Sequence, residues 1–209
     1  MTYNAETCLL DMLMTQLTFQ KKLADKRSIV SPDNTDVDVQ TKLNLACYHS
    51  ACTNIELAEF VEQYLLDNKN ITEDVMLELT DAFTFLLNQF LYLNLIPTKT
   101  LNYYYTAAEK ALKSYDGQDH EITYYEIIGQ FEMAVGSLYH KTRYKSWKTY
   151  TEHSDDIYSL IPLVDNVMTS FLQLYVKVGA TSEQIFKYFY QKHEVNVKRQ
   201  EVGGKYETA

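Results

Sequence analysis

Residues 54–81 read NIELAEFVEQYLLDNKNITEDVMLELTD, and this stretch decides the fold. Apolar residues recur at helical spacing on both sides of the run Asp67-Asn68-Lys69-Asn70, which is typical of a chain reversal. Thr72 is placed as a helix N-cap, and the acids that follow it suit the positive end of a helix dipole. The stretch therefore predicts two antiparallel helices, over about 41–66 and from Thr72 to about residue 94, joined by a tight turn.

Helical spacing of apolar residues continues through the rest of the chain. Further helices are expected over about 4–26, 98–114, 120–148, 154–178 and 182–199. Thr181 and Gln184 have the spacing of a capping box at the start of the last one. Only 6 Gly and 3 Pro among 209 residues argue against a turn-rich β fold and against disorder. We expect an all-α helical bundle of about six to seven helices, forming a single domain over 1–209 with a C-terminal tail at 200–209 that could be mobile.

Composition excludes several classes of function. The longest apolar runs are far shorter than the roughly 18 residues of a membrane span, and the N-terminus lacks the order of a secretory signal. The three cysteines have no CxxC spacing, which favours free thiols in a reducing cytoplasm. A formal net charge of −9 disfavours non-specific binding to nucleic acid. We expect a cytoplasmic protein that binds neither membranes nor nucleic acid.

Four carboxylates occupy matching positions on the two central helices. Glu56 and Glu59 are three residues apart, as are Glu78 and Asp81, so each pair shares one helix face. The midpoint between residues 56 and 81 and the midpoint between residues 59 and 78 fall at the same place in the predicted turn. In an antiparallel pair the four acids therefore lie level, about nine residues or roughly 14 Å from the turn.

The surroundings of these acids favour a bound cation. Eleven of the seventeen residues from 75 to 91 are apolar and surround the helix axis, which predicts a buried helix. Buried acids need a partner, yet Lys and Arg are absent from 54–68 and from 70–97. Carboxylate oxygens suit Mg²⁺ or Mn²⁺. A solvated or structural acid cluster is the alternative.

A basic stripe occupies the last predicted helix. Lys192, Asn196 and Arg199 are four and three residues apart and share a face, where their donors suit phosphate oxygens. Alone, such a stripe is more often an ordinary solvated surface. Together with a metal site it indicates cleavage of a nucleoside polyphosphate, because cations neutralise charge on the transferring group.

Three segments carry a resemblance to a known family. Glu56-Leu-Ala-Glu59 with Glu78-Leu-Thr-Asp81 resembles the ExxE…ExxD signature of the all-α, MazG-like nucleoside triphosphate pyrophosphohydrolases. The segment 192–200, KHEVNVKRQ, followed by Gly204-Lys-Tyr206, resembles the KNxxNxxRQxxGY ending of the dimeric all-α dUTPases. The segment 19–25, FQKKLAD, is similar to the LQxKLND stretch of that family. The small size suggests a phage-encoded member.

The resemblance implies a function and a set of site residues. It implies hydrolysis of dUTP to dUMP and pyrophosphate by a homodimer in the cytoplasm of a bacterial host. Two or more Mg²⁺ ions, or Mn²⁺, would be held by Glu56, Glu59, Glu78 and Asp81. Glu56 or Glu59 would orient and deprotonate the attacking water. The phosphates would contact Lys192, Asn196, Arg199 and Tyr206, and the uracil would contact Gln20.

Some positions depart from the family pattern. Ala24 stands where LQxKLND has Asn, and Thr84 stands where a His often follows the aspartate of ExxD. The stretch of the type FKxWK that usually follows ExxE is missing after Glu59. These departures bear on the base rather than on the metal chemistry, so dCTP or several deoxynucleotides are an alternative substrate. Some phage dUTPases also bind repressors of mobile genetic elements, which is a further alternative role.

Overall fold

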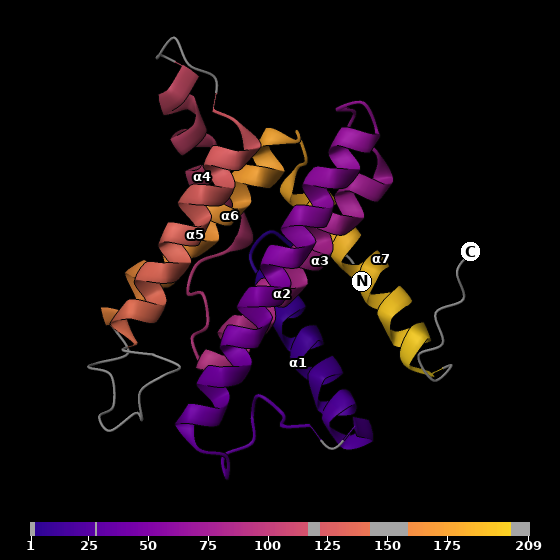
Figure 1. The fold of residues 1–209 in the computed structure, drawn as a ribbon, viewed down its shortest axis with the longest axis vertical. Helices are drawn as coiled ribbons and strands as arrows, with labels where there is room; N and C mark the ends of the chain where they lie inside the picture. The colour runs from indigo at the N-terminus through magenta and orange to yellow at the C-terminus, as the bar shows by residue number, and fades with distance from the viewer. Residues whose placement is uncertain (1–2, 28, 117–121, 143–158, 202–209) are drawn as a thin grey trace.

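The structure, a computed structural model, describes residues 3–27, 29–116, 122–142 and 159–201. These residues form seven helices and no strand, which confirms the all-α prediction (Figure 1). The helices are α1 (Cys8–Arg27), α2 (Val39–Leu66), α3 (Glu73–Leu93), α4 (Leu101–Asp116), α5 (Tyr124–Lys141), α6 (Ile161–Lys177) and α7 (Ser182–Glu201). None of the described helices is both long enough and apolar enough to cross a membrane.

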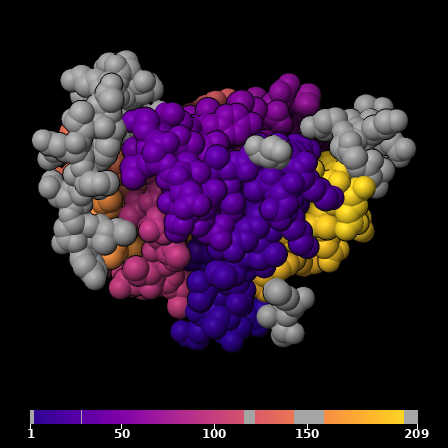
Figure 2. All heavy atoms as spheres, turned by 90° about the horizontal axis from the view of Figure 1, so that it is seen from below, coloured from indigo at the N-terminus to yellow at the C-terminus, as the bar shows by residue number. Residues whose placement is uncertain are grey.

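Helix α3 lies at the centre of the bundle. It packs along α2 as an antiparallel hairpin and also contacts α1 and α7. Helices α4 and α5 both pack on α6 and form the other side of the molecule (Figure 1). Seen from below, α1 and α2 cover most of the face, and α7 lies at its edge (Figure 2). The hairpin is therefore placed where other helices can bring side chains up to it.

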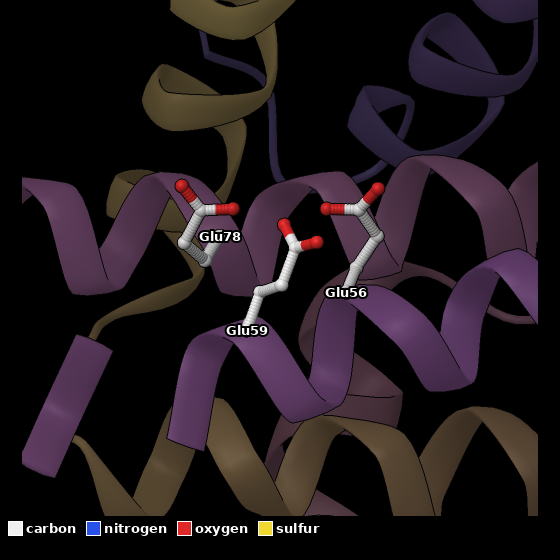
Figure 3. Close-up of side chains that lie close together, drawn as sticks. All are labelled: Glu56, Glu59 and Glu78. Carbon is white, nitrogen blue, oxygen red and sulfur yellow. The ribbon is translucent and has the colours of Figure 1, made fainter. Parts of the chain in front are cut away.

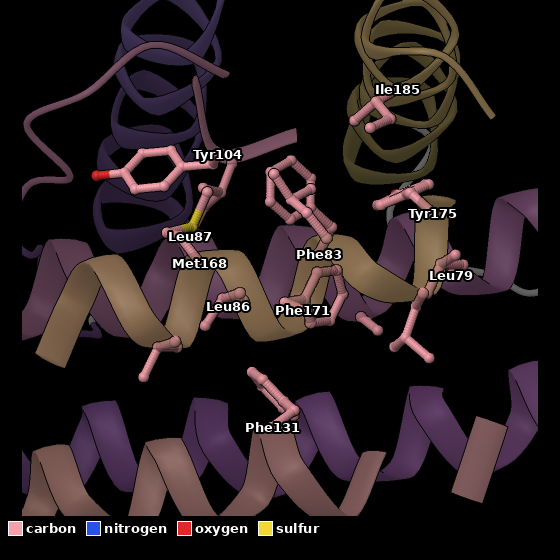
Figure 4. Close-up of a cluster of buried hydrophobic side chains, with 14 of the residues drawn as sticks. Leu79, Phe83, Leu86, Leu87, Tyr104, Phe131, Met168, Phe171, Tyr175 and Ile185 are labelled. Atoms are coloured by element: carbon pink, nitrogen blue, oxygen red, sulfur yellow. The ribbon is translucent and has the colours of Figure 1, made fainter. Parts of the chain in front are cut away.

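One apolar core joins the two sides. Phe171 of α6 stacks on Phe83 of α3 at 5.6 Å between ring centroids and meets the edge of Phe131 of α5 at 5.2 Å (Figure 4). All three rings are at most 1% exposed. The core cluster thus connects α3, α5 and α6, and it includes buried residues from every described helix. Burial of α3 on nearly all sides confirms the prediction made from its apolar sequence.

The turn between α2 and α3 forms as its sequence predicts. Asn68 and Lys69 both adopt left-handed backbone conformations, at φ 54° and 63°, which reverse the chain. The Thr72 hydroxyl then accepts a hydrogen bond from the Val75 N–H and caps α3. At the start of α7, the predicted Thr181–Gln184 capping box is also present.

The helix bounds differ from expectation in the second half of the chain. Helix α5 begins at Tyr124 rather than near residue 120, because Thr123 and Glu126 form a capping box that ends the preceding connection. It ends at Lys141, and residues 143–148 of the predicted helix lie outside the described part. Helix α6 begins at Ile161, with Pro162 in its first turn, where a missing N–H costs nothing.

Candidate metal centre

The α2–α3 hairpin brings three glutamates together. Glu56 and Glu59 extend from α2 and Glu78 extends from α3, and their carboxylates approach one another (Figure 3). One carboxylate oxygen from each lies within 4.8 Å of the others, close enough for a single ion to bind all three. Glu59 is exposed, while Glu56 and Glu78 are half-buried. The register predicted from the turn therefore holds for these three residues.

Asp81, the fourth predicted ligand, is not a member of this group. Its Oδ2 lies 2.5 Å from Nζ of Lys192 on α7, and the two side chains are only 17% and 10% exposed. No base lies close to these acids along the chain, but Asp81 is paired with a lysine that is distant in sequence. Local sequence cannot reveal this partner, since the pair depends on the packing of α7 against α3.

The site is short of positive charge. Burial, followed by the charges of Asp81, Glu59 and Glu78, raises the pKa of Glu56 to about 7. Burial also raises the pKa of Glu78, although the Lys192 charge acts in the opposite direction. Burial raises the pKa of Asp81 as well, against Lys192 and Arg199, which lower it. Glu56 therefore has a pKa near neutral pH chiefly because it is buried, and secondly because like charges surround it.

A divalent cation fits this donor set. Within the described part of the chain, no lysine or arginine pairs with Glu56, Glu59 or Glu78. Three hard carboxylate oxygens within reach of one ion match the ligand preference of Mg²⁺ and Mn²⁺. An ion placed between them would replace mutual repulsion by attraction, which lowers the cost of ionising Glu56.

Helix α7 brings the basic stripe up to the hairpin. Lys192 is buried, Asn196 is half-buried and Arg199 is exposed, so the stripe runs from the core to solvent. The far end of α7 is tied to α1, because Arg27 Nη2 donates to Gln200 Oε1 at 2.8 Å. Tyr206 lies outside the described residues.

Gln20, the predicted uracil contact, lies on α1. It is only 5% exposed and makes no hydrogen bond to any residue that the structure describes. The Gln20 amide is not among the buried polar atoms that lack a partner, so it is accessible although most of the residue is buried. Gln20 therefore has donor and acceptor capacity available for a ligand.

The family comparison covers nearly the whole chain. A dUTPase family model matches residues 9–204, from α1 to the C-terminal tail. The chain belongs to the all-α dUTPase family. Membership assigns it hydrolysis of dUTP, and with it a nucleotide substrate. No curated protein and no solved structure matched the chain.

Two buried polar contacts join α1, α2 and α3 and could not be predicted from the sequence. Gln89 of α3 donates to Thr53 of α2 at 2.8 Å, and Gln16 of α1 donates to Asn88 of α3 at 3.0 Å. These bonds fix α1 and α2 against α3. Their only signal in the sequence is a set of amides inside apolar helices, which does not identify the partners.

Cation binding should depend on pH because Glu56 must lose its proton first. With its pKa at about 7, we expect Mg²⁺ affinity to fall by about tenfold per pH unit below pH 7, for one released proton. In the metal-free protein the folded-state pKa exceeds the unfolded value. The contribution of Glu56 to the free energy of unfolding therefore decreases as pH rises from about 4.5 to about 7.

Calorimetric titration with Mg²⁺ at pH 5.5 to 8, in two buffers of different ionisation enthalpy, measures both affinity and proton release. Glu62→Gln is the matched control, since Glu62 is an exposed acid on the same helix and lies outside the cluster. An affinity that stays constant from pH 5.5 to 7.5 would contradict the raised pKa of Glu56.

Proposed function

We propose that this dUTPase depends on Mg²⁺ held by Glu56, Glu59, Glu78 and Asp81. The observation that carries the proposal is the convergence of three glutamates from two facing helices within 4.8 Å, in a chain that matches the dUTPase family. Mn²⁺ fits the same oxygen donors. Two or more ions agree with four carboxylates of which one, Asp81, lies outside the group of three.

The roles of the acidic residues follow from their positions. Bound Mg²⁺ would neutralise charge on the phosphates and favour ionisation of the attacking water. Glu56 or Glu59 would orient that water and accept its proton. Glu59 is the more exposed of the two, whereas Glu56 is half-buried. Both alternatives place the base on α2.

The basic stripe would bind the phosphates. Arg199 can donate two parallel hydrogen bonds to one phosphate group, and Lys192 supplies a point charge. Asn196 lies between them on α7 and contributes an uncharged donor. Tyr206, in the tail, is proposed as a fourth contact on the strength of the family motif.

Which nucleobase the substrate carries is a separate question from the metal chemistry. Gln20 is mostly buried, but its amide makes no hydrogen bond to a described residue and can form hydrogen bonds to a pyrimidine edge. Thr84 replaces the frequent His, and its hydroxyl already donates to the Thr80 carbonyl at 2.9 Å, so it can only accept from a base. Ala24 removes an amide from α1. These two positions favour dCTP hydrolysis, or broader activity, as the second candidate.

A panel of dUTP, dCTP, dTTP, dATP, dGTP and UTP, assayed for pyrophosphate release with Mg²⁺ and with EDTA, tests the proposal. We expect kcat/KM for dUTP to exceed that for every other nucleotide by at least about tenfold, because hydrogen bonds to the base reject poorly matched analogues. A higher value for dCTP, or equal values across the panel, would replace dUTP specificity by the broader activity.

We also infer a homodimer. Exposed apolar side chains on the outer side of α2 support it: Tyr48 is 62% exposed, Ile55 56% and Leu66 68%. A phage origin, a place in the cytoplasm of a bacterial host and binding of a repressor protein rest on the family resemblance alone.

A further inference from the structure

One ion pair stands out beside the three glutamates. The Lys192 Nζ lies 2.5 Å from the Asp81 Oδ2, and Lys192 as a whole is only 8% exposed. A lysine is rarely buried to this extent without a charged partner. A second contact holds α7 to the start of α3 nearby, where Gln191 Nε2 donates to Glu73 Oε1 at 2.5 Å. Lys192 is therefore held on Asp81 by the packing of its helix.

The four acids therefore differ in whether a basic side chain is paired with them. Asp81 already has a cation from within the chain, whereas the three glutamates have no basic partner among the described residues. A divalent ion that used Asp81 as a ligand would approach the Lys192 ammonium in a region shielded from solvent. Two cations on one carboxylate repel each other strongly in such surroundings. Binding of the metal to Asp81 therefore weakens the ion pair with Lys192, and the ion pair weakens binding of the metal.

Lys192 can leave Asp81 only if another anion receives its charge. A nucleoside triphosphate supplies that anion, and Lys192 lies on the same helix as Asn196 and Arg199, the other proposed phosphate contacts. Moving the ammonium from a carboxylate to a phosphate keeps it paired throughout, so no unpaired buried charge is created.

We propose that Lys192 is an internal cation that competes with the metal for Asp81, and that the phosphates of the substrate draw it away. This inference rests on the proposed metal site. Without nucleotide, Glu56, Glu59 and Glu78 would hold the metal, and Asp81 would be free to serve as a ligand once Lys192 has moved to the phosphates. Nucleotide and metal therefore strengthen each other's binding, because each favours the state in which Lys192 has left Asp81.

Binding of Mn²⁺ without nucleotide, followed by electron paramagnetic resonance, tests the competition without measuring activity. Lys192→Met should bind Mn²⁺ about tenfold more tightly than the wild type, within the usual range for coupled sites. Lys192→Arg keeps the charge and should resemble the wild type. Lys198→Met, at an exposed lysine of the same helix, should leave the affinity unchanged. Asp81→Asn combined with Lys192→Met should lose the gain.

The wild type offers a second measurement that needs no variant. A non-hydrolysable imido analogue of dUTP should raise Mn²⁺ affinity by about tenfold, and this rise should be absent in Lys192→Met. Suppose that the wild type binds Mn²⁺, that Lys192→Met binds it equally well and that the analogue has no effect. The proposed competition would then be wrong, while the proposed metal site would stand. A wild type that binds no Mn²⁺ would overturn the proposed metal site as well. Circular dichroism checks that each variant is folded.

Discussion

Replacing Glu59 with glutamine is expected to lower kcat for dUTP by at least about 10²- to 10⁴-fold, the range for loss of a positioned base, and further if a metal ligand is lost too. Glu59 is one of the three carboxylates that converge within 4.8 Å. The amide has nearly the same shape but neither accepts a proton at neutral pH nor carries charge for a cation. Pyrophosphate release at saturating Mg²⁺ measures the effect.

The fold should survive this change, because Glu59 is exposed on α2 and makes no contact on which the core depends. Thermal unfolding should therefore be close to that of the wild type. Glu62→Gln, one turn further along α2, removes the same charge outside the cluster and should keep nearly full activity. A Glu59→Gln variant within about threefold of the wild type would remove Glu59 from the chemistry.

Phe171→Ala is expected to have the largest effect on stability. The ring is fully buried and contacts Phe83, Phe131 and Tyr175, so it joins α3, α5 and α6. Removing a buried Phe side chain costs about 3–5 kcal/mol, from lost burial and from the cavity that remains. This is a large share of the roughly 5–15 kcal/mol that holds a typical domain folded.

Urea unfolding followed by circular dichroism measures the free energy of unfolding, and the melting temperature should fall by roughly 6–20 °C. Tyr125→Ala is the control, because Tyr125 is an aromatic residue of α5 that is 66% exposed, and it should change the free energy by less than about 0.5 kcal/mol. A loss below about 1 kcal/mol for Phe171→Ala would mean that this core does not connect the two sides of the bundle.

Local sequence was sufficient to predict the hairpin. The turn at residues 67–70 and the cap at Thr72 depend on neighbouring residues only, and both are present in the structure. Because they set the register of α2 against α3, the convergence of Glu56, Glu59 and Glu78 could be predicted from the centre of the turn. Composition and helical spacing were likewise enough for the all-α fold.

Contacts between distant helices could not be predicted in the same way. The Lys192–Asp81 pair depends on the angle and register at which α7 crosses α3, which no local signal specifies. The exposure of Glu59 also follows from tertiary packing, since the described helices bury α3 on more sides than they bury α2. Helix α5 begins at Tyr124 rather than near residue 120 because Thr123 and Glu126 form a capping box, whose residue types are present in the sequence.

Much of the negative charge of the chain is concentrated in the α2–α3 hairpin of the folded molecule. Residues 54–81 hold eight acids against one lysine, and three of these acids converge while a fourth is paired with α7. The negative charge is therefore gathered at one site beside a basic helix. This arrangement suits a divalent cation and a phosphate ester, as we propose for this member of the dUTPase family.

Release of pyrophosphate from dUTP by the purified wild-type protein, at increasing Mg²⁺ and in EDTA, tests the central claim most directly. A metal site formed by Glu56, Glu59, Glu78 and Asp81 predicts that hydrolysis rises with Mg²⁺ to saturation and falls to background in EDTA. Full activity in EDTA, or no hydrolysis of dUTP at any Mg²⁺ concentration, would contradict a metal-dependent dUTPase site in this hairpin.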